Sequence, residues 1–261
     1  MTEKIILNSD GIKSLKNLLS LCPDTFSSVP VKFIKEDGVS FISIEVIDIN
    51  GDIVFSGKTL IDDIADIEDN SGLIIRLPLN RGLINNILSN FEELIITKNK
   101  ITAKSPNKKL TMSLFLIDEN DIFEFPHTNT GLYELAVTEN SAENSKFVAF
   151  DPDLEQIKEL LDTISFFSDL ELIEFKEKNN KLIITSGDII GNEFEFRFDI
   201  DVEPGFTCKF DMNLVKVLNK VIKYKNDDSY KINFLISDLL FGITLENDKS
   251  LVTLAVTARR D

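Results

Sequence analysis

Residues 211–223 read Asp-Met-Asn-Leu-Val-Lys-Val-Leu-Asn-Lys-Val-Ile-Lys, the pattern of a short amphipathic helix. Apolar side chains recur three and four positions apart, which places them on one face of a helix. These apolar residues are Leu214, Val217, Leu218, Val221 and Ile222. The opposite face is polar and carries Asn213, Lys216, Lys220 and Lys223. The stretch therefore predicts a helix that packs on a core and presents lysines on its other side.

Three earlier segments have the same helical pattern, namely Ser9–Leu21, Asn80–Asn90 and Asp151–Ile164. Each begins with a residue type that caps helices, and Pro152 suits a first helical position. The four predicted helices start 71, 71 and 60 residues apart. A period of this kind indicates duplicated modules.

Strand-like runs fill the sequence between the helices. They alternate apolar and polar residues, and turn-forming glycine, asparagine and aspartate residues separate them. The predicted strands are Lys32–Lys35, Val39–Asp48, Ile53–Ser56, Leu94–Thr97, Ile101–Lys104, Leu110–Ile117, Leu172–Lys176, Leu182–Thr185, Glu193–Asp199, Tyr230–Ile236, Phe241–Glu246 and Ser250–Val256. Each module thus combines one strand, one helix and several antiparallel strands, which predicts an α+β fold.

A polar stretch in the middle of the chain separates the modules into two pairs. We therefore predict an N-terminal domain over residues 1–117, a linker over 118–132 and a C-terminal domain over 133–261.

Composition limits the class of protein. The chain has 261 residues, 28 basic and 44 acidic, and a net charge of −16, which argues against simple nonspecific binding to nucleic acid. No apolar run approaches the roughly 20 residues of a membrane span, and the N-terminus lacks the apolar core of a signal peptide. The two cysteines, Cys22 and Cys208, form no disulfide framework or metal pattern. We expect an intracellular protein without a membrane segment.

Catalytic motifs are absent from the sequence. The single histidine, His127, stands in a loop-like stretch without an obvious orienting partner. Five residues separate Gly51 from Gly57, whereas a phosphate-binding loop needs four. The acidic run at 62–69 lacks the ligand spacing of a calcium loop. We therefore expect no enzyme activity, no metal and no cofactor, although a site that the sequence hides is an open alternative.

Four stretches, in this order along the chain, resemble DNA sliding clamps of the proliferating cell nuclear antigen (PCNA) type. Lys32–Phe41 is similar to the first hairpin of that family, and Leu77–Leu88 to the strand that leads into its second helix. Ser186–Asn192 resembles the turn of the second domain, and Leu251–Ala258 the last strand. The resemblance implies a homotrimeric ring around double-stranded DNA, with four helices lining the hole and antiparallel sheets outside.

The helices of such a ring would present basic side chains to DNA without reading its sequence. The candidate DNA-binding residues are Lys13, Lys16, Arg81, Lys158, Lys216, Lys220 and Lys223. The third helix departs from this pattern, because Glu155, Glu159 and Asp162 make its polar face acidic. The alternative is that these lysines only solvate helix surfaces. A second basic cluster, at 98–109, is either a solvated hairpin or a loop near DNA.

The resemblance also implies a pocket for short hydrophobic peptides of a DNA polymerase and a clamp loader. Its candidate residues are Val46, Ile47, Ile49, Ile53, Ile122, Phe123, Phe125, Pro126, Leu240, Leu254, Val256 and Ala258. Their alternative role is to pack the linker onto the body.

By the same resemblance, the strand at Leu110–Ile117 of one subunit joins a strand around Leu182–Ser186 of the next. The candidate interface residues are Leu110, Met112, Leu114, Leu116, Leu182 and Ile184. The rival hypothesis is a polymerase accessory subunit of the same fold that forms no ring and binds DNA from one side. The compartment, nucleus or cytoplasm, depends on the source.

Overall fold

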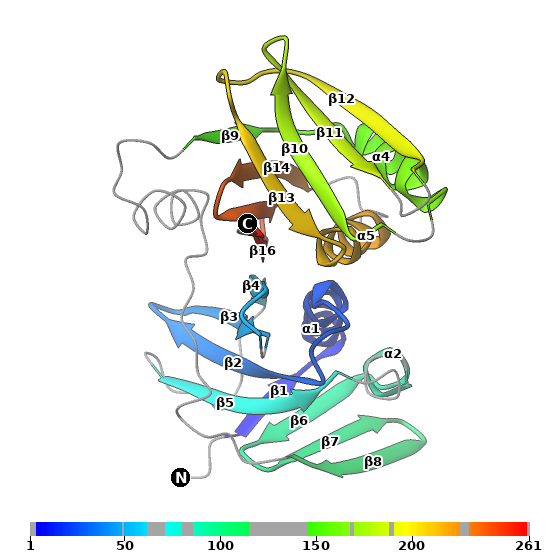
Figure 1. Cartoon of the computed structure of the whole chain (residues 1–261). Coiled ribbons are helices and arrows are strands. Elements are labelled where there is room, and N and C mark those ends of the chain that lie inside the picture. The colour runs from blue at the N-terminus through cyan, green and yellow to red at the C-terminus, as the bar shows by residue number, and fades with distance from the viewer. Residues whose placement is uncertain are drawn as a thin grey trace. The chain divides into compact units, whose positions relative to one another are not determined.

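The structure is a computed structural model that describes residues 4–48, 50–61, 71–79, 86–114, 146–167, 170–187, 191–224 and 230–259. The chain forms two compact units (Figure 1). Unit 1 comprises Met1–Asp48, Phe55–Phe125 and Asn247–Val252. Unit 2 comprises Ile49–Val54, Pro126–Glu246 and Thr253–Asp261.

The described residues of unit 1 form two helices and strands of two sheets. Its elements are β1 (Lys4–Leu7), α1 (Ser9–Leu21), β2 (Ser28–Glu36), β3 (Val39–Ile47), β4 (Ile53–Ile61), β5 (Ser71–Pro78), α2 (Leu88–Asn90), β6 (Glu93–Thr97), β7 (Lys100–Ser105) and β8 (Lys108–Ser113). The first two residues of β4 belong to unit 2. One sheet has the order β1-β6-β7-β8 with antiparallel neighbours, and the other contains β5-β2-β3-β4.

Unit 2 repeats this plan. Its elements are β9 (Phe147–Phe150), α4 (Leu154–Ser165), β10 (Leu172–Lys178), β11 (Lys181–Gly187), β12 (Glu193–Asp201), β13 (Thr207–Asp211), α5 (Asn213–Tyr224), β14 (Lys231–Ser237), β15 (Leu240–Glu246) and β16 (Ser250–Thr257). The first three residues of β16 belong to unit 1. One antiparallel sheet has the order β12-β11-β10-β13, and the other contains β16-β15-β14-β9. The predicted α+β class, built from modules of one helix and several antiparallel strands, is confirmed.

Aromatic side chains fill much of the core of unit 2. The Phe241 ring lies 5.5 Å from Phe175, 5.8 Å from Phe210 and 4.9 Å from Phe234, centroid to centroid. All four side chains are buried. Such tilted and edge-on pairs add to the stabilisation from apolar burial. The sheet that carries β10 and β13 is therefore firmly attached to the sheet that carries β14 and β15.

The helices bury the faces that their spacing predicts. In α5 the buried residues are Leu214, Val217, Leu218 and Val221. In α4 they are Ile157, Leu160, Leu161 and Ile164, and in α1 they include Ile12, Leu15, Leu18 and Leu19. The described charged side chains of these helices lie on the opposite, more exposed faces. No helix of the described residues is long and apolar enough to span a membrane.

Two predicted helix starts are wrong by one or two residues. The cap of α1 is Asn8 rather than Ser9, because the Asn8 side chain accepts a hydrogen bond from the Gly11 N–H at 2.9 Å. The cap of α4 is Asp153 rather than Asp151. Its carboxylate accepts from the Glu155 N–H, and Gln156 bonds back to the Asp153 N–H in a capping box.

The last predicted helix also starts later than expected, at Asn213 rather than Asp211. The Asp211 carboxylate accepts a hydrogen bond from the Asn213 N–H at 2.8 Å, so that β13 runs through Asp211 before the helix begins. Residues 80–85 of the predicted second helix lie outside the described residues.

Candidate DNA-facing helices and open sheet edges

Helix α5 presents the clearest basic face. Lys216 is exposed and Lys220 half-buried, on the side opposite the buried Leu214 and Val217. The Lys216 Nζ donates to the Asn213 Oδ1 at 2.9 Å, which leaves the ammonium charge uncompensated by any carboxylate of the described residues. The Lys223 side chain lies outside the described part. An uncompensated, exposed ammonium group is suited to a phosphate contact.

Helix α1 offers a weaker basic face. Lys13 is exposed and Lys16 half-buried, while Asp10 occupies the first turn. A carboxylate there interacts favourably with the helix dipole. Arg81, the remaining candidate in this unit, lies outside the described residues.

Helix α4 has the opposite character. The Lys158 Nζ lies 2.7 Å from the Glu155 Oε1, so its charge is compensated within the helix. Glu159 and Asp162 are exposed on the same helix. Because α4 packs on α5, an acidic and a basic helix lie side by side in unit 2. The geometry therefore favours phosphate at α5 and disfavours it at α4.

The edge strands of the sheets bear on the predicted subunit interface. Strand β8 is at one end of its sheet order, and its Leu110 side chain is 43% exposed. Met112 is half-buried and Leu114 buried, while Leu116 lies outside the described residues. Edge strands expose unpaired backbone groups that can pair with another chain. Strand β8 has the geometry expected of one half of the junction.

The other half of the predicted interface is wrong. Strand β11, which carries Leu182 and Ile184, lies between β10 and β12 and pairs with both. Both side chains are fully buried. A central strand has no backbone groups left for a second subunit, and the strand that the resemblance placed at the interface packs in the core instead.

The open edge of that sheet is β12. On the opposite edge, the Arg259 N–H donates to the Lys209 O of β13 at 2.8 Å, so the end of the chain covers part of that strand. Exposed and more buried side chains alternate along β12, with the carboxylates and Arg197 on the outer face and the phenylalanines on the inner face. The sequence Glu-Phe-Glu-Phe-Arg-Phe-Asp-Ile-Asp carried this signal, because strict alternation is typical of a half-exposed strand.

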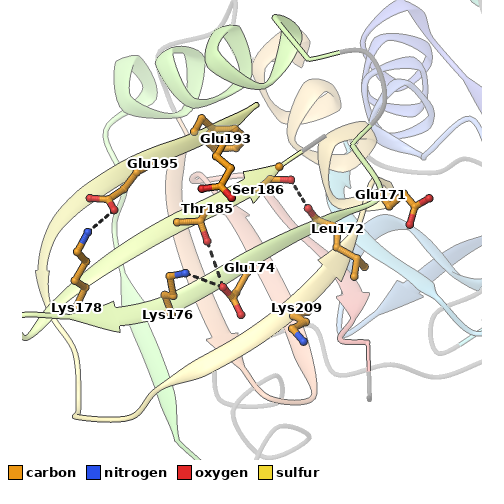
Figure 2. Close-up of a pocket in the computed structure, with 12 residues that line it drawn as sticks. Glu171, Leu172, Glu174, Lys176, Lys178, Thr185, Ser186, Glu193, Glu195 and Lys209 are labelled. Carbon is orange, nitrogen blue, oxygen red and sulfur yellow. Dashed lines mark hydrogen bonds and ion pairs between the residues drawn. The ribbon is translucent and has the colours of Figure 1, made fainter. Parts of the chain in front are cut away.

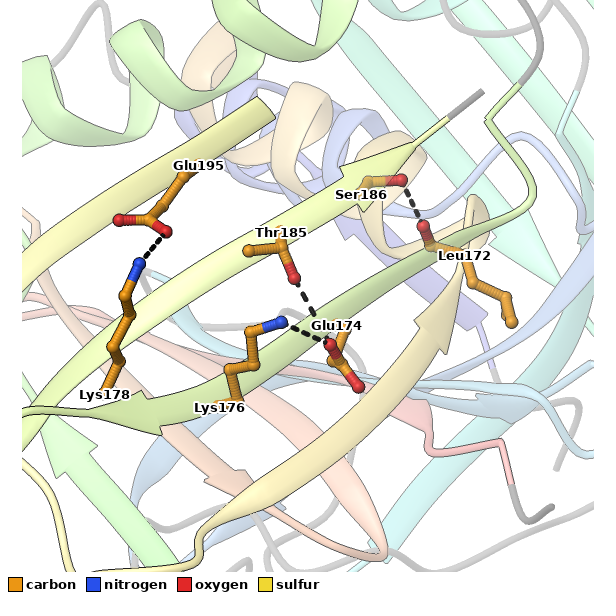
Figure 3. A network of polar contacts seen from close by, with 7 residues as sticks. All are labelled: Leu172, Glu174, Lys176, Lys178, Thr185, Ser186 and Glu195. Atoms are coloured by element: carbon orange, nitrogen blue, oxygen red, sulfur yellow. Dashed lines mark hydrogen bonds and ion pairs between the residues drawn. The ribbon is translucent and has the colours of Figure 1, made fainter. Parts of the chain in front are cut away.

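A shallow hollow of about 900 Å³ lies on the outer face of the same sheet (Figure 2). Within it, the Lys176 Nζ lies 2.9 Å from the Glu174 Oε2, which also accepts from the Thr185 hydroxyl at 3.3 Å. Lys178 reaches across to Glu195 of β12 at 2.5 Å (Figure 3). The first pair lies within β10 and the second spans from β10 across β11 to β12. Both lysines are compensated, so the hollow offers little net attraction for an anion.

Ion pairs also organise the far end of β12. The Lys181 Nζ lies 3.0 Å from the Asp199 Oδ1 and 2.9 Å from the Asp201 Oδ1. Hydrogen bonding to Lys181 lowers the pKa of Asp199, and the two carboxylates raise the pKa of Lys181. One ammonium thus serves two carboxylates, and a negative charge remains at this edge.

Most residues predicted to line the peptide pocket are either buried in the core or outside the described residues. Ile53, Leu254 and Val256 are fully buried within unit 2 and pack its interior. Leu240 is also buried, and Ala258 is half-buried. Ile49, Ile122, Phe123, Phe125 and Pro126 lie outside the described residues.

On unit 1, Val46 is half-buried and Ile47 is 39% exposed. The sequence analysis missed a smaller hollow of about 350 Å³ in this unit, bordered by the exposed apolar side chains of Val39 and Leu60. Isolated apolar residues at turns and strand ends gave no sequence signal for it.

Catalytic groups are not evident in the described residues. Burial raises the pKa of the Cys208 thiol, which keeps it protonated and unreactive. No cluster of three or more potential metal ligands occurs in the described ranges.

Comparison with known proteins identifies the fold. No protein-family model and no curated protein matches the sequence. Among solved structures, the chain is similar to A. fulgidus PCNA bound to the C-terminal region of FEN-1, with 12% identity, a TM-score of 0.63 and 100% and 99% of the two chains covered. It is similar to Entamoeba histolytica PCNA, with 11% identity, a TM-score of 0.64 and full coverage of both chains.

The DNA polymerase sliding clamp of Caulobacter crescentus is a third neighbour, at 12% identity and a TM-score of 0.63. All of this chain but only 66% of the bacterial chain is covered. The chain therefore has the fold of DNA sliding clamps. Its form of that fold is the shorter one of PCNA, since the two PCNA chains are covered almost completely.

Proposed function

We propose that this protein is a non-enzymatic DNA sliding clamp, which encircles double-stranded DNA as a homotrimeric ring and tethers DNA polymerase. The observation that carries the proposal is the clamp fold together with a basic helix face on α5 and two strands, β8 and β12, that end their sheets among the described residues. Binding to DNA then depends on ring topology and on salt-dependent phosphate contacts rather than on base readout.

The proposed ring joins β8 of one subunit to β12 of the next. Such head-to-tail contacts close into a ring when the rotation between subunits permits. An exposed apolar side chain near β12 supports its role as a subunit edge. Phe166, at the end of α4, is 86% exposed. The neighbouring Phe167 ring lies 5.3 Å from Phe194 of β12, so Phe166 is close to the start of the open strand. An exposed phenylalanine beside an edge strand is typical of a subunit contact.

Mass in solution distinguishes the ring from its rival. Light scattering coupled to size-exclusion chromatography should give about three times the 29.5 kDa subunit mass. A mass of one or two subunits would instead favour an accessory subunit that binds DNA from one side.

The acidic helix α4 yields a prediction about DNA affinity. Replacing Glu159 with Gln and Asp162 with Asn should strengthen DNA binding by a few-fold at about 50 mM salt, because two repelling charges are removed. Replacing Lys158 with Ala should change affinity little, since Glu155 already compensates that charge. Fluorescence anisotropy with circular and linear duplexes would measure both effects. Weaker binding by the Glu159 and Asp162 variant would contradict this reading of α4.

We further propose that unit 1 contributes to capture of short hydrophobic peptides from the polymerase and the clamp loader. The A. fulgidus clamp was solved with the C-terminal region of FEN-1, which supports this mode of binding. The exposed apolar side chains of Ile47 and Val39 on β3 are the candidate contacts in the described part of unit 1. A peptide needs apolar anchors together with accessible backbone groups.

Replacing Ile47 with Glu should weaken binding of a polymerase C-terminal peptide by about tenfold or more, because a carboxylate would have to be desolvated against an apolar partner. The matched control is Leu172→Glu in unit 2, since Leu172 has the same exposure of 39% as Ile47. Isothermal calorimetry would measure both affinities. Undiminished affinity in the Ile47 variant together with a loss in Val39→Glu would move the contact to the hollow beside Val39.

A further inference from the structure

We propose that the junction between subunits is matched in charge, with the lysines of β8 in one copy facing the carboxylates of β12 in the next. This match selects head-to-tail pairing over pairing of like edges. The inference rests on the proposed ring, and the occupant of each edge is a second copy of this chain.

Strand β8 is basic along its open edge. Lys108 and Lys109 are both exposed, and the strand contains no acidic residue. Lys109 lies on the outer face, whereas Lys108, at the start of the strand, lies on the same side as Leu110. In the antiparallel register, Lys109 stands opposite Lys104, and Lys100 of β7 stands opposite Ser113. Lys104 pairs with Glu93 at 3.0 Å, but Lys109 and Lys100 have no ion-pair partner in the described residues. The outer face of this edge therefore keeps a surplus of positive charge.

Strand β12 is acidic along its open edge. Glu193, Glu195, Asp199 and Asp201 alternate with inward apolar residues, and Arg197 is the one basic residue of the strand. Lys178 compensates Glu195, and a single Lys181 serves both aspartates. Glu193 has no ion-pair partner within the described ranges, and the Asp199 side chain is 83% exposed. A surplus of negative charge thus remains after the pairs within the subunit are counted.

The apolar sides of the two edges match as well. On β8, Leu110 and Met112 stand opposite the buried Ala103 and Ile101, so they belong to the inward face. Leu110 is exposed and Met112 half-buried, and no further strand of the described ranges pairs with β8 on that side. Phe196 and Ile200 are likewise half-buried on the inward face of β12.

Pairing β8 with β12 would therefore continue both faces of the sheet together. Apolar side chains would meet on the inward face, and Lys109 would meet carboxylates on the outer face, with Lys108 adding positive charge at the start of the edge.

Charge also disfavours the alternative pairings. Two β12 edges would bring carboxylates together, and two β8 edges would bring lysines together; like charges directly opposite in a sheet are destabilising. Strand β5, another edge, has one charged residue, Arg76, which donates to the Ser28 hydroxyl at 3.3 Å. Of these pairings, that of β8 with β12 brings opposite charges together, and such contacts between unlike edges generate rings, rather than two-fold dimers, when the rotation between subunits closes.

Charge reversal tests this inference. The variant Lys108→Glu/Lys109→Glu should weaken association, and so should Glu193→Lys/Asp199→Lys, which leaves Asp201 in place to pair with Lys181. Each exposed ion pair contributes about a two- to fivefold change in affinity, so each double variant should weaken a junction by roughly tenfold. The quadruple variant restores opposite charges at every junction and should recover trimer formation.

Sedimentation velocity at about 50 mM and about 1 M NaCl measures these changes, because salt shortens the screening length from about 10 Å near 0.1 M to about 3 Å. Wild-type association should weaken at high salt, and the effect of each reversal should shrink there. The control variant Lys231→Glu/Lys249→Glu makes the same change in net charge as the β8 double variant, at exposed positions away from both edges. Circular dichroism melting confirms that all variants are folded.

The two proposals fail in different ways. A trimer that both double variants retain undiminished at low salt would overturn the charge match and leave the ring in place. The charge match would also be overturned if the folded double variants lose association and the quadruple variant does not recover it. A wild-type protein that is monomeric at all salt concentrations would overturn the ring itself, and this inference with it.

Discussion

Replacing Lys216, Lys220 and Lys223 with glutamate should abolish processive stimulation of the polymerase while the protein stays folded. Lys216 and Lys220 lie on the polar face of α5, opposite the buried Leu214 and Val217, so their replacement does not disturb the core. Each phosphate contact that is lost should reduce the salt slope of DNA binding by about 0.9 and affinity by roughly tenfold near 0.1 M salt. Primer extension on a long template and salt titrations of DNA binding would measure the two effects.

The control for this triple variant is a folded ring with a similar gain in negative charge. Lys231→Glu and Lys249→Glu alter exposed residues outside α5. Stimulation should survive in the control. A triple α5 variant that still forms trimers and still supports long extension products would remove α5 from the DNA surface.

Periodicity predicted the fold because helix and strand spacing reflect burial directly. Leu214, Val217 and Leu218 are fully buried in α5, as their spacing requires. Short strands were harder to predict: β1 and β9 have four residues each, too few for a pattern to emerge. Helix starts were misplaced because neighbouring Asn8 and Ser9, or Asp151 and Asp153, are both competent caps. Which one caps depends on the geometry of the entering chain.

The candidate sites were less predictable, because they depend on the order of strands in a sheet. Leu182 and Ile184 form an apolar run that fits either an edge or a central strand, and only the pairing of β11 on both sides decides between them. Exposure of Phe166 likewise follows from the end of α4 and not from its sequence. The ion pair between Lys158 and Glu155 could be predicted from the sequence, because residues three apart on a helix are neighbours.

Proline substitutions should have different effects in the central strand β11 and the edge strand β8. The largest loss of unfolding free energy is expected at Ile184 of β11. Ile184 is fully buried in β11, opposite Phe175 and Phe196. Proline removes a backbone donor from a strand that is paired on both sides, and it also leaves a gap in the core. The Ile184→Pro variant should lose at least ~3 kcal/mol of unfolding free energy, which denaturant titration would measure.

On the edge strand β8, proline should break assembly instead. Neighbouring residues of an antiparallel strand point their N–H groups in opposite directions, so one of Thr111 and Met112 directs its donor away from β7. The single variant at that position keeps the β7–β8 ladder but removes the N–H that would donate to the next subunit, so a carbonyl of that subunit is left unpaired. The expected product is a folded monomer whose association is weakened about fivefold to a hundredfold, by the cost of one unsatisfied buried group. Thr111→Pro and Met112→Pro, each examined by light scattering and thermal melting, would reveal it. If both variants remain folded trimers, β8 is not the subunit edge.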